Sequence, residues 1–252
     1  PVSSTPTPTR TLLPPTNTHT PTLTYTPSIT PTPTNTPTAT LPAQGLQGEQ
    51  NILNLLNTLP VDALPWDAEQ FGLITDNDGS QYWRLGRGTL GDGVILITLP
   101  DDFLETYFGN NAATRIYRME VELSLMSYNP PLLVDGQVFF GTLLQSVADP
   151  AVVAGLDVQV VDTNIINLGH RIGGFDDPDS VNPLSQRSVG SVIVSVRLER
   201  DQANGGVVVF VNGNPLGNPI TFVGAQEAIL PGIYVKDGGV IVYVTRWTIT
   251  LR

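Results

Sequence analysis

The sequence predicts an all-β protein: a two-sheet antiparallel sandwich (jelly roll) that follows an extended Thr/Pro-rich N-terminal arm. Two observations predict the sandwich. Many short segments alternate apolar and polar residues with the two-residue period of a β-strand, and glycine and asparagine turn signals separate them at regular spacing. A third observation, an abrupt change of composition near Gly48, divides the chain into the arm, residues 1–48, and the sandwich, residues 49–252.

The arm has no acidic residue and a single basic one, Arg10, and it consists mostly of threonine and proline. Such a stretch carries too little apolar surface to offset the entropy of ordering its backbone, so it cannot form a core of its own. Segments of this composition are typical of O-glycosylated stalks.

Hydroxyl groups recur at every second residue of the arm over residues 16–40. An extended strand places all of them on one face, which we interpret as the acceptor face for O-glycans. Leu23, Tyr25 and Ile29 lie on the opposite face and are the candidate contacts with another subunit. The candidate acceptors are Thr16, Thr18, Thr20, Thr22, Thr24, Thr26, Ser28, Thr30, Thr32, Thr34, Thr36, Thr38 and Thr40.

Two conformations of the arm fit its composition. A polyproline II helix would make it a semi-rigid spacer, but a threefold helix spreads the hydroxyls around its axis and leaves the period of two unexplained. A strand accommodates the prolines, because those at odd positions remove donors from one edge only. The strand hypothesis predicts that the arm pairs with a sheet, or lies in a groove, of a neighbouring subunit.

Charge and composition exclude several classes of function. Residues 49–252 hold all 23 acidic side chains and 11 of the 12 basic ones, which argues against nucleic acid or an anionic membrane as a partner. The chain has no cysteine and two histidines, so a disulfide framework is excluded and the usual zinc sites are not expected. No apolar run reaches the ~18 residues of a membrane span.

The first element after the arm is a short helix over residues 49–58. Four apolar residues recur at helical spacing before Pro60 ends the pattern: Ile52, Leu55, Leu56 and Leu59. Alternation then predicts strands over 119–125 and 192–198, each with one buried and one solvated face. Residues 207–211 are apolar on both faces, which predicts a central strand that ends at the Asn212-Gly213 turn.

The remaining elements are shorter or less regular. A helical turn is expected to begin at Asp101-Asp102. Apolar runs between turn signals predict further strands near residues 82–85, 93–99, 137–144, 156–162, 219–223, 232–236 and 239–251.

The C-terminal segments carry a resemblance to a known fold family. Ser195-Val-Arg-Leu-Glu-Arg is followed by Gly206-Val-Val-Val-Phe-Val-Asn-Gly213, then by Gly232-Ile-Tyr-Val and a last strand with Trp247. This succession resembles the second half of a concanavalin A-like (laminin G-like) jelly roll, over about residues 66–252, behind the mucin-like stalk of a bacterial surface protein. The resemblance implies the sandwich fold and a group of lectins, carbohydrate-binding modules, glycoside hydrolases and adhesive domains.

The hydrolases of this group carry Glu-x-Asp-x-x-Glu on a strand, and the sequence has no such triplet. The nearest match is Glu120 and Glu122, which lack the third acid. Paired carboxylates are the groups that glycoside hydrolysis requires, so a glycosidase that uses this pair is the enzymatic hypothesis. The simpler interpretation is two solvated carboxylates beside Arg118.

Two further motifs have simple interpretations. Gly86-x-Gly88-x-x-Gly91 matches a dinucleotide-binding motif by letter, but a predicted strand follows it instead of the required helix, so we interpret it as a loop. His170 lies in a predicted loop without a nucleophile or metal partner, which indicates a surface or hydrogen-bonding histidine.

The tryptophans are candidates for sugar binding. Trp66, Trp83 and Trp247 could stack on sugars, but aromatic residues of sandwiches usually serve the core, and Trp247 is expected there.

The chain offers weak calcium candidates and no other cofactor or metal site. Acidic loops can supply the oxygen ligands of calcium, although these lack EF-hand spacing and a solvated turn is the simpler interpretation. The candidates are Asp76, Asp78, Asp176, Asp177 and Asp179.

These observations predict a non-enzymatic extracellular or cell-surface structural protein without a cofactor. In this hypothesis it is a glycosylated filament or surface-array subunit whose arm contacts neighbouring subunits, because heterologous contacts that do not close produce polymers. The alternative is a carbohydrate-binding or adhesive module on a flexible stalk. The first hypothesis has covalent O-glycans on the arm, and neither hypothesis involves nucleic acid or a membrane span.

Overall fold

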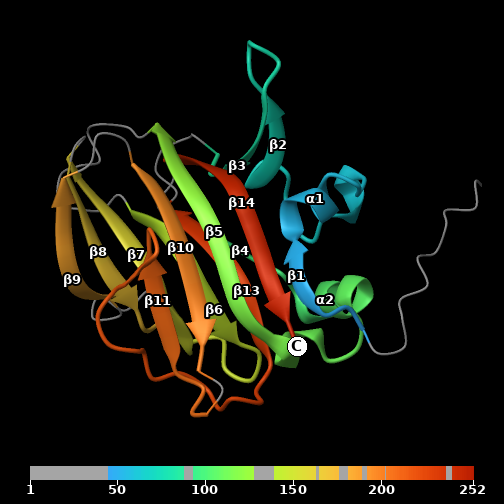
Figure 1. The fold of residues 1–252 in the computed structure, drawn as a ribbon. Helices are drawn as coiled ribbons and strands as arrows, with labels where there is room; N and C mark the ends of the chain where they lie inside the picture. The colour runs from blue at the N-terminus through green and yellow to red at the C-terminus, as the bar shows by residue number, and fades with distance from the viewer. Residues whose placement is uncertain are drawn as a thin grey trace, which may run out of the picture. The chain divides into compact units, whose positions relative to one another are not determined.

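The computed structural model describes residues 45–87, 93–127, 139–162, 165–175, 181–188, 192–201, 203–236 and 240–252. Over these residues the chain forms two antiparallel sheets packed as a sandwich, as the sequence predicts (Figure 1). Strands dominate and helices are few. No helix in these ranges is long and apolar enough to cross a membrane.

The first sheet, sheet A, has the strand order β12-β11-β10-β5-β14-β3-β2, and β1 pairs with the end of β14. Its central pair is β5 and β14, the two longest strands of the sheet. The strands are β1 (Gly48–Asn51), β2 (Phe71–Thr75), β3 (Gln81–Leu85), β5 (Ile116–Ser127), β10 (Ile193–Arg200), β11 (Val207–Val211), β12 (Asn214–Pro215) and β14 (Ile241–Leu251).

The second sheet, sheet B, has the strand order β4-β13-β6-β7-β8-β9, and every neighbouring pair is antiparallel. Its strands are β4 (Val94–Thr98), β6 (Phe139–Ser146), β7 (Val153–Asp162), β8 (Ile165–Arg171), β9 (Val181–Ser188) and β13 (Ile229–Lys236).

Alternation along the strands buries the inner face of each sheet. On β5, Met119, Val121 and Leu123 are buried, and the residues between them belong to the opposite face. Trp247 of β14 is fully buried in the same core, as expected. Removing these apolar side chains from water, at about 25 cal/mol per Å² of apolar surface, is the main force that holds the two sheets together.

The helices differ from the prediction at their ends. Residues 49–51 belong to β1 and not to a helix, because they pair with the end of β14. The helix begins one residue after Asn51, whose Oδ1 accepts a hydrogen bond from the N–H of Asn54 at 3.0 Å. The helical turn predicted at Asp101 is a longer helix. The helices are α1 (Ile52–Leu56), the 3-10 helix η1 (Val61–Ala63), α2 (Asp101–Phe108) and α3 (Ala112–Arg115).

Two strand predictions are wrong in detail. Residues 219–223 do not form a strand, since only Ile220 forms a bridge, with Val207. β11 is not central either, because its outer neighbour is the two-residue edge strand β12. The Asn212-Gly213 turn is confirmed: both residues have positive φ, 50° and 80°, as a tight hairpin turn requires.

Candidate functional site: an arginine-lined pocket

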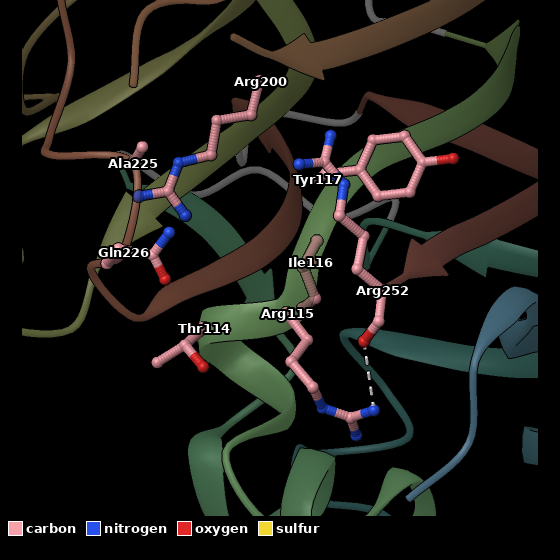
Figure 2. Close-up of a pocket in the computed structure, with 8 residues that line it drawn as sticks. All are labelled: Thr114, Arg115, Ile116, Tyr117, Arg200, Ala225, Gln226 and Arg252. Atoms are coloured by element: carbon pink, nitrogen blue, oxygen red, sulfur yellow. Dashed lines mark hydrogen bonds between the residues drawn. The ribbon is translucent and has the colours of Figure 1, made fainter. Parts of the chain in front are cut away.

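A pocket of about 280 Å³ lies where the first residues of β5 meet the ends of β10 and β14. Three arginines from three elements line it: Arg115 at the end of α3, Arg200 at the end of β10, and Arg252, which follows β14 (Figure 2). We call this site the arginine pocket. Its other lining residues are Thr114, Ile116, Tyr117, Ala225 and Gln226.

The register of sheet A brings these arginines together. Glu199 of β10 lies opposite Arg118 of β5, and Leu251 of β14 lies opposite Ile116 of β5. In both neighbouring strands the next residue is an arginine. The ends of β10 and β14 therefore deliver one guanidinium each on the two sides of β5.

Arg115 is held by backbone carbonyl groups. Its Nη1 donates to the carbonyl of Leu46 at 2.7 Å, and its Nη2 donates to the carbonyl of Phe108 at 2.7 Å. A longer contact of 3.5 Å joins Nη1 to the carbonyl of Arg252. Its Nε is buried and has no hydrogen-bond partner within the described ranges. A buried donor of this kind calls for an acceptor.

Arg200 is a second lining residue of the arginine pocket that the fold holds in place. Only 4% of its surface is exposed, its Nη1 donates to the carbonyl of Glu227 at 2.9 Å, and its Nη2 donates to the carbonyl of Gly224. Its Nε is also buried without a partner in the part of the chain that the structure describes. Burial lowers the pKa of Arg200, Glu227 opposes this shift, and the like charge of Arg252 lowers the pKa further. A guanidinium nevertheless stays protonated at pH 7.

Among the described residues, no carboxylate forms an ion pair with an arginine of the pocket. The ion pairs among the described residues involve other arginines and none of these three. The carboxylate of Glu227 accepts a hydrogen bond from the N–H of Gly224 at 2.9 Å, and Arg252 stacks on the ring of Tyr117 at 4.2 Å. The like charges of Arg200 and Arg252 repel one another, so an anion beside them would be stabilised by both, while the guanidinium of Arg115 lies apart from these two (Figure 2).

A second hollow of about 440 Å³ adjoins the arginine pocket. The two share Tyr117, Arg200 and Arg252, and the second continues over apolar side chains of β11. Two of its lining residues are acids, Glu199 and Asp201. An anionic group is therefore favoured only near the arginines, and the rest of the hollow suits uncharged parts of a ligand.

The candidate pair Glu120 and Glu122 lies on the outer face of β5, and both carboxylates have partners. Glu120 pairs with Arg246 at 2.9 Å and with Arg118 at 3.8 Å, and Glu122 accepts a hydrogen bond from Oγ1 of Thr245 at 2.6 Å. Neither glutamate lines the arginine pocket. The arrangement fits the simpler interpretation, surface carboxylates balanced by arginines.

The three tryptophans pack around one phenylalanine of the core. Their rings surround Phe71, at centroid distances of 5.5 Å for Trp66, 5.0 Å for Trp83 and 5.9 Å for Trp247. The indole N–H of Trp66 donates to the carbonyl of Phe71, and that of Trp83 donates to Oδ1 of Asn57 at 2.9 Å.

His170 lies on β8 and not in a loop, so that part of the prediction is wrong. The side chain is buried, and its Nε2 lies 2.6 Å from the carbonyl oxygen of Leu216. A carbonyl can only accept, so Nε2 carries the proton and donates. Burial lowers the pKa of His170, an effect that the hydrogen bond to Leu216 opposes. This is a hydrogen-bonding histidine, as predicted.

The calcium candidates lie partly inside the described ranges. Asp78 accepts a hydrogen bond from the N–H of Ser80 at 2.8 Å, and the hydrogen bonds from Ser80 lower its pKa. No group of three or more metal-ligating side chains occurs among the described residues. Calcium binding stays a prediction, because three of the candidates lie outside the described ranges: Asp176, Asp177 and Asp179.

Other predicted features also fall outside these ranges. The proposed glycan acceptors over residues 16–40 and the proposed contacts Leu23, Tyr25 and Ile29 are among them. Of the three motif glycines only Gly86 is described, and the element that follows them is the strand β4, as the loop interpretation requires.

Sequence reasoning missed the three pocket arginines. Arg200 and Arg252 share one signal that could have indicated them: each stands where an alternating strand pattern ends. Arg115 carries no such signal, since it belongs to a four-residue helix that the sequence did not predict.

The chain is similar to known proteins in its fold alone. No family model and no curated protein matches its sequence, but several solved structures are similar to it. Among the solved structures to which it is similar is the carbohydrate-binding module CBM66 from Bacillus subtilis, at 9% identity over 72% of this chain and 93% of that one, with a TM-score of 0.41. Likeness at this level carries no information about ligand or reaction.

Two further similar structures are enzymes by their names. An alginate lyase from Pseudomonas aeruginosa is 11% identical over 74% of this chain and 100% of that one, with a TM-score of 0.41. A GH16 protein of the Bacteroides ovatus mixed-linkage glucan locus is 11% identical over 72% of this chain and 85% of that one, with the same TM-score. The fold and the site together define a two-sheet β-sandwich module with an arginine-lined pocket.

Proposed function

We propose that this domain is a non-enzymatic carbohydrate-binding module and that its arginine pocket binds the carboxylate or sulfate group of an acidic saccharide. The observation that supports this proposal is that Arg115, Arg200 and Arg252 line one pocket and have no ion-pair partner among the described residues. Guanidinium groups bind carboxylates and sulfates through charge-assisted hydrogen bonds, which are the strong ones.

The size and charge of the surroundings narrow the ligand class. The pocket, about 280 Å³, suits one sugar unit, and Thr114 and Gln226 offer polar groups to its hydroxyls. The net charge of −11 disfavours a polymer with a charge on every unit. The ligand of this proposal is therefore a largely neutral glycan with an isolated acidic group.

Calorimetric titration of the full chain tests this function. The probes are an oligosaccharide with one terminal glucuronate, its neutral counterpart, a singly sulfated counterpart, inorganic sulfate, and a short peptide with a free C-terminal carboxylate. We expect an acidic saccharide to bind and its neutral counterpart not to bind. We also expect the binding to weaken as the salt concentration rises. Preferred binding of the peptide, or no binding of any acidic saccharide, would overturn it.

Arg252→Gln is the matching variant because Arg252 is exposed and forms no ion pair with any described residue. We expect it to weaken binding about tenfold or more, the usual worth of a charge-assisted hydrogen bond. Arg87→Gln makes the same change of charge at an exposed residue outside the arginine pocket. This control should bind like the original chain.

A second candidate function is the glycosylated filament or surface-array subunit at the cell surface. The observation that favours it is the unbroken alternation of hydroxyls over residues 16–40. Deletion of residues 1–44 should abolish polymers in electron micrographs, and undiminished polymers would rule out the arm as the connector. An intact mass well above 27.1 kDa, assigned to the threonines of the arm, would support the O-glycans.

A further inference from the structure

We infer that a second groove, between α1 and the β2–β3 hairpin, binds a neutral glycan independently of the arginine pocket. The groove measures about 410 Å³. We call it the amide groove because amide side chains dominate its polar lining and none of its lining residues is charged. It is lined by Asn51, Leu53, Asn54, Asn57, Leu73, Gln81, Tyr82, Trp83, Val244 and Thr245.

The pairing of β14 creates this groove. β3 pairs with β14 at residues 242–244, and β1 pairs with β14 at residues 248–251. The residues between them have neither partner, and the register between β14 and β5 shifts at the same place, between Val244 and Arg246. Irregularities of this kind are common beside functional sites because they interrupt the regular sheet.

Two of the amides are fixed by the fold in a defined orientation. Oδ1 of Asn57 accepts the hydrogen bond from the indole of Trp83 at 2.9 Å, and Oδ1 of Asn51 accepts from the N–H of Asn54 at 3.0 Å. Each carbonyl oxygen is therefore committed to the protein. The amide nitrogens remain as donors, and no described residue accepts from them.

An apolar surface lies beside these donors. Tyr82 lines the groove and is held by stacking on Tyr243, with ring centroids 4.9 Å apart and 14° between the planes. Leu73 is 43% exposed, which is unusual for a leucine in a strand of this sandwich. Oriented amide donors beside an aromatic ring match the alternating hydroxyls and C–H faces of a sugar. The absence of lining charges indicates a neutral one.

The inference is tested on the full chain with cellohexaose, laminarihexaose, mannohexaose and xylohexaose as probes, and with a Thr-Pro peptide copied from residues 30–40. At least one hexasaccharide should shift the side-chain amide signals of Asn51 and Asn57 in NMR spectra. This binding should be indifferent to salt, since no charge lines the groove. Shifts produced by the peptide alone, or by none of the probes, would overturn the inference.

The variant for this test is the double change Asn54→Ala and Gln81→Ala, because both side chains are exposed and have no hydrogen bond within the described ranges that their loss would break. It should weaken hexasaccharide binding about tenfold. Asn214→Ala removes an exposed amide elsewhere and should leave binding unchanged. Arg252→Gln should also leave it unchanged, so the failure of one site is distinguishable from the failure of the other.

Discussion

Asp157 and Arg171 form a buried ion pair across the neighbouring strands β7 and β8 of sheet B, with side-chain exposures of 0% and 4%. The hydroxyl of Tyr234, on β13, lies 3.2 Å from the same carboxylate oxygen and donates to the carbonyl of Leu156 at 2.7 Å. Burial raises the pKa of Asp157, and the charge of Arg171 opposes this shift. Asp157, Arg171 and Tyr234 together link three strands of sheet B, namely β7, β8 and β13.

Replacing Asp157 by Asn should lower the free energy of unfolding by about 3 kcal/mol, because it removes a fully buried charge that pairs with the buried guanidinium of Arg171. Urea denaturation monitored by tryptophan fluorescence measures the loss. Glu49→Gln is the control, since it interrupts an exposed pair with Arg246 at 3.7 Å and should cost well under about 1 kcal/mol. Equal losses in the two variants would contradict the role given to the buried pair.

Gly141 lies against the backbone of β7 and the ring of Tyr234. A Cβ at residue 141 would clash first with the carbonyl oxygen of Leu156, and it would also lie 2.6 Å from the hydroxyl oxygen of Tyr234, closer than real Cβ atoms approach. Gly141→Ala should therefore lower the free energy of unfolding by about 2 kcal/mol through overpacking. Gly93→Ala, where a Cβ would meet nothing within 4 Å, is the matched control and should be near neutral. A neutral Gly141→Ala would show that neither the backbone of β7 nor Tyr234 needs this space.

The buried histidine makes stability depend on pH. Because burial lowers the pKa of His170, the unfolded chain takes up a proton near pH 6.5 before the folded chain does. Stability is therefore lost as the pH falls below about 6.5. His170→Gln should lose less stability than the original chain between pH 7 and pH 5 in urea titrations. An identical pH dependence in the variant would remove His170 as the cause.

Asn57 is the acceptor for the buried indole N–H of Trp83, at 2.9 Å. Asn57→Ala leaves this donor without a partner and should lower the free energy of unfolding by about 1–3 kcal/mol. Asn54→Ala, an exposed amide in the same segment, should change it by less than about 0.5 kcal/mol. Thermal unfolding of the two variants side by side distinguishes a structural amide from a surface one.

The sequence predicts the sandwich because strands such as β5 and β10 have one wet face. The alternation of β5 and β10 is visible in the chain, and both strands appear where expected. β8 and β9 were missed for opposite reasons: β8 buries residues of both parities, so its pattern does not alternate, while β9 is polar and contains Pro183. β9 is an edge strand of sheet B, where a proline is tolerated. The sequence does not show which strands lie at an edge.

The arginine pocket could not be predicted from the sequence, for a different reason. Arg115, Arg200 and Arg252 are far apart in the chain, and they meet only because β10 and β14 flank β5 in one particular register. A shift of one residue would turn each strand's side chains to the other face of the sheet. The amide groove likewise depends on the interrupted pairing of β14, which no local pattern indicates.

The buried Nε–H groups of Arg115 and Arg200 provide the most direct test of the arginine pocket. Their NMR signals can be followed in the full chain while the glucuronate-bearing oligosaccharide is added, with the neutral counterpart as reference. Our account predicts that both signals move with the acidic saccharide, that neither moves with the neutral one, and that Arg252→Gln weakens the response. Signals that stay in place while the saccharide binds elsewhere would contradict it.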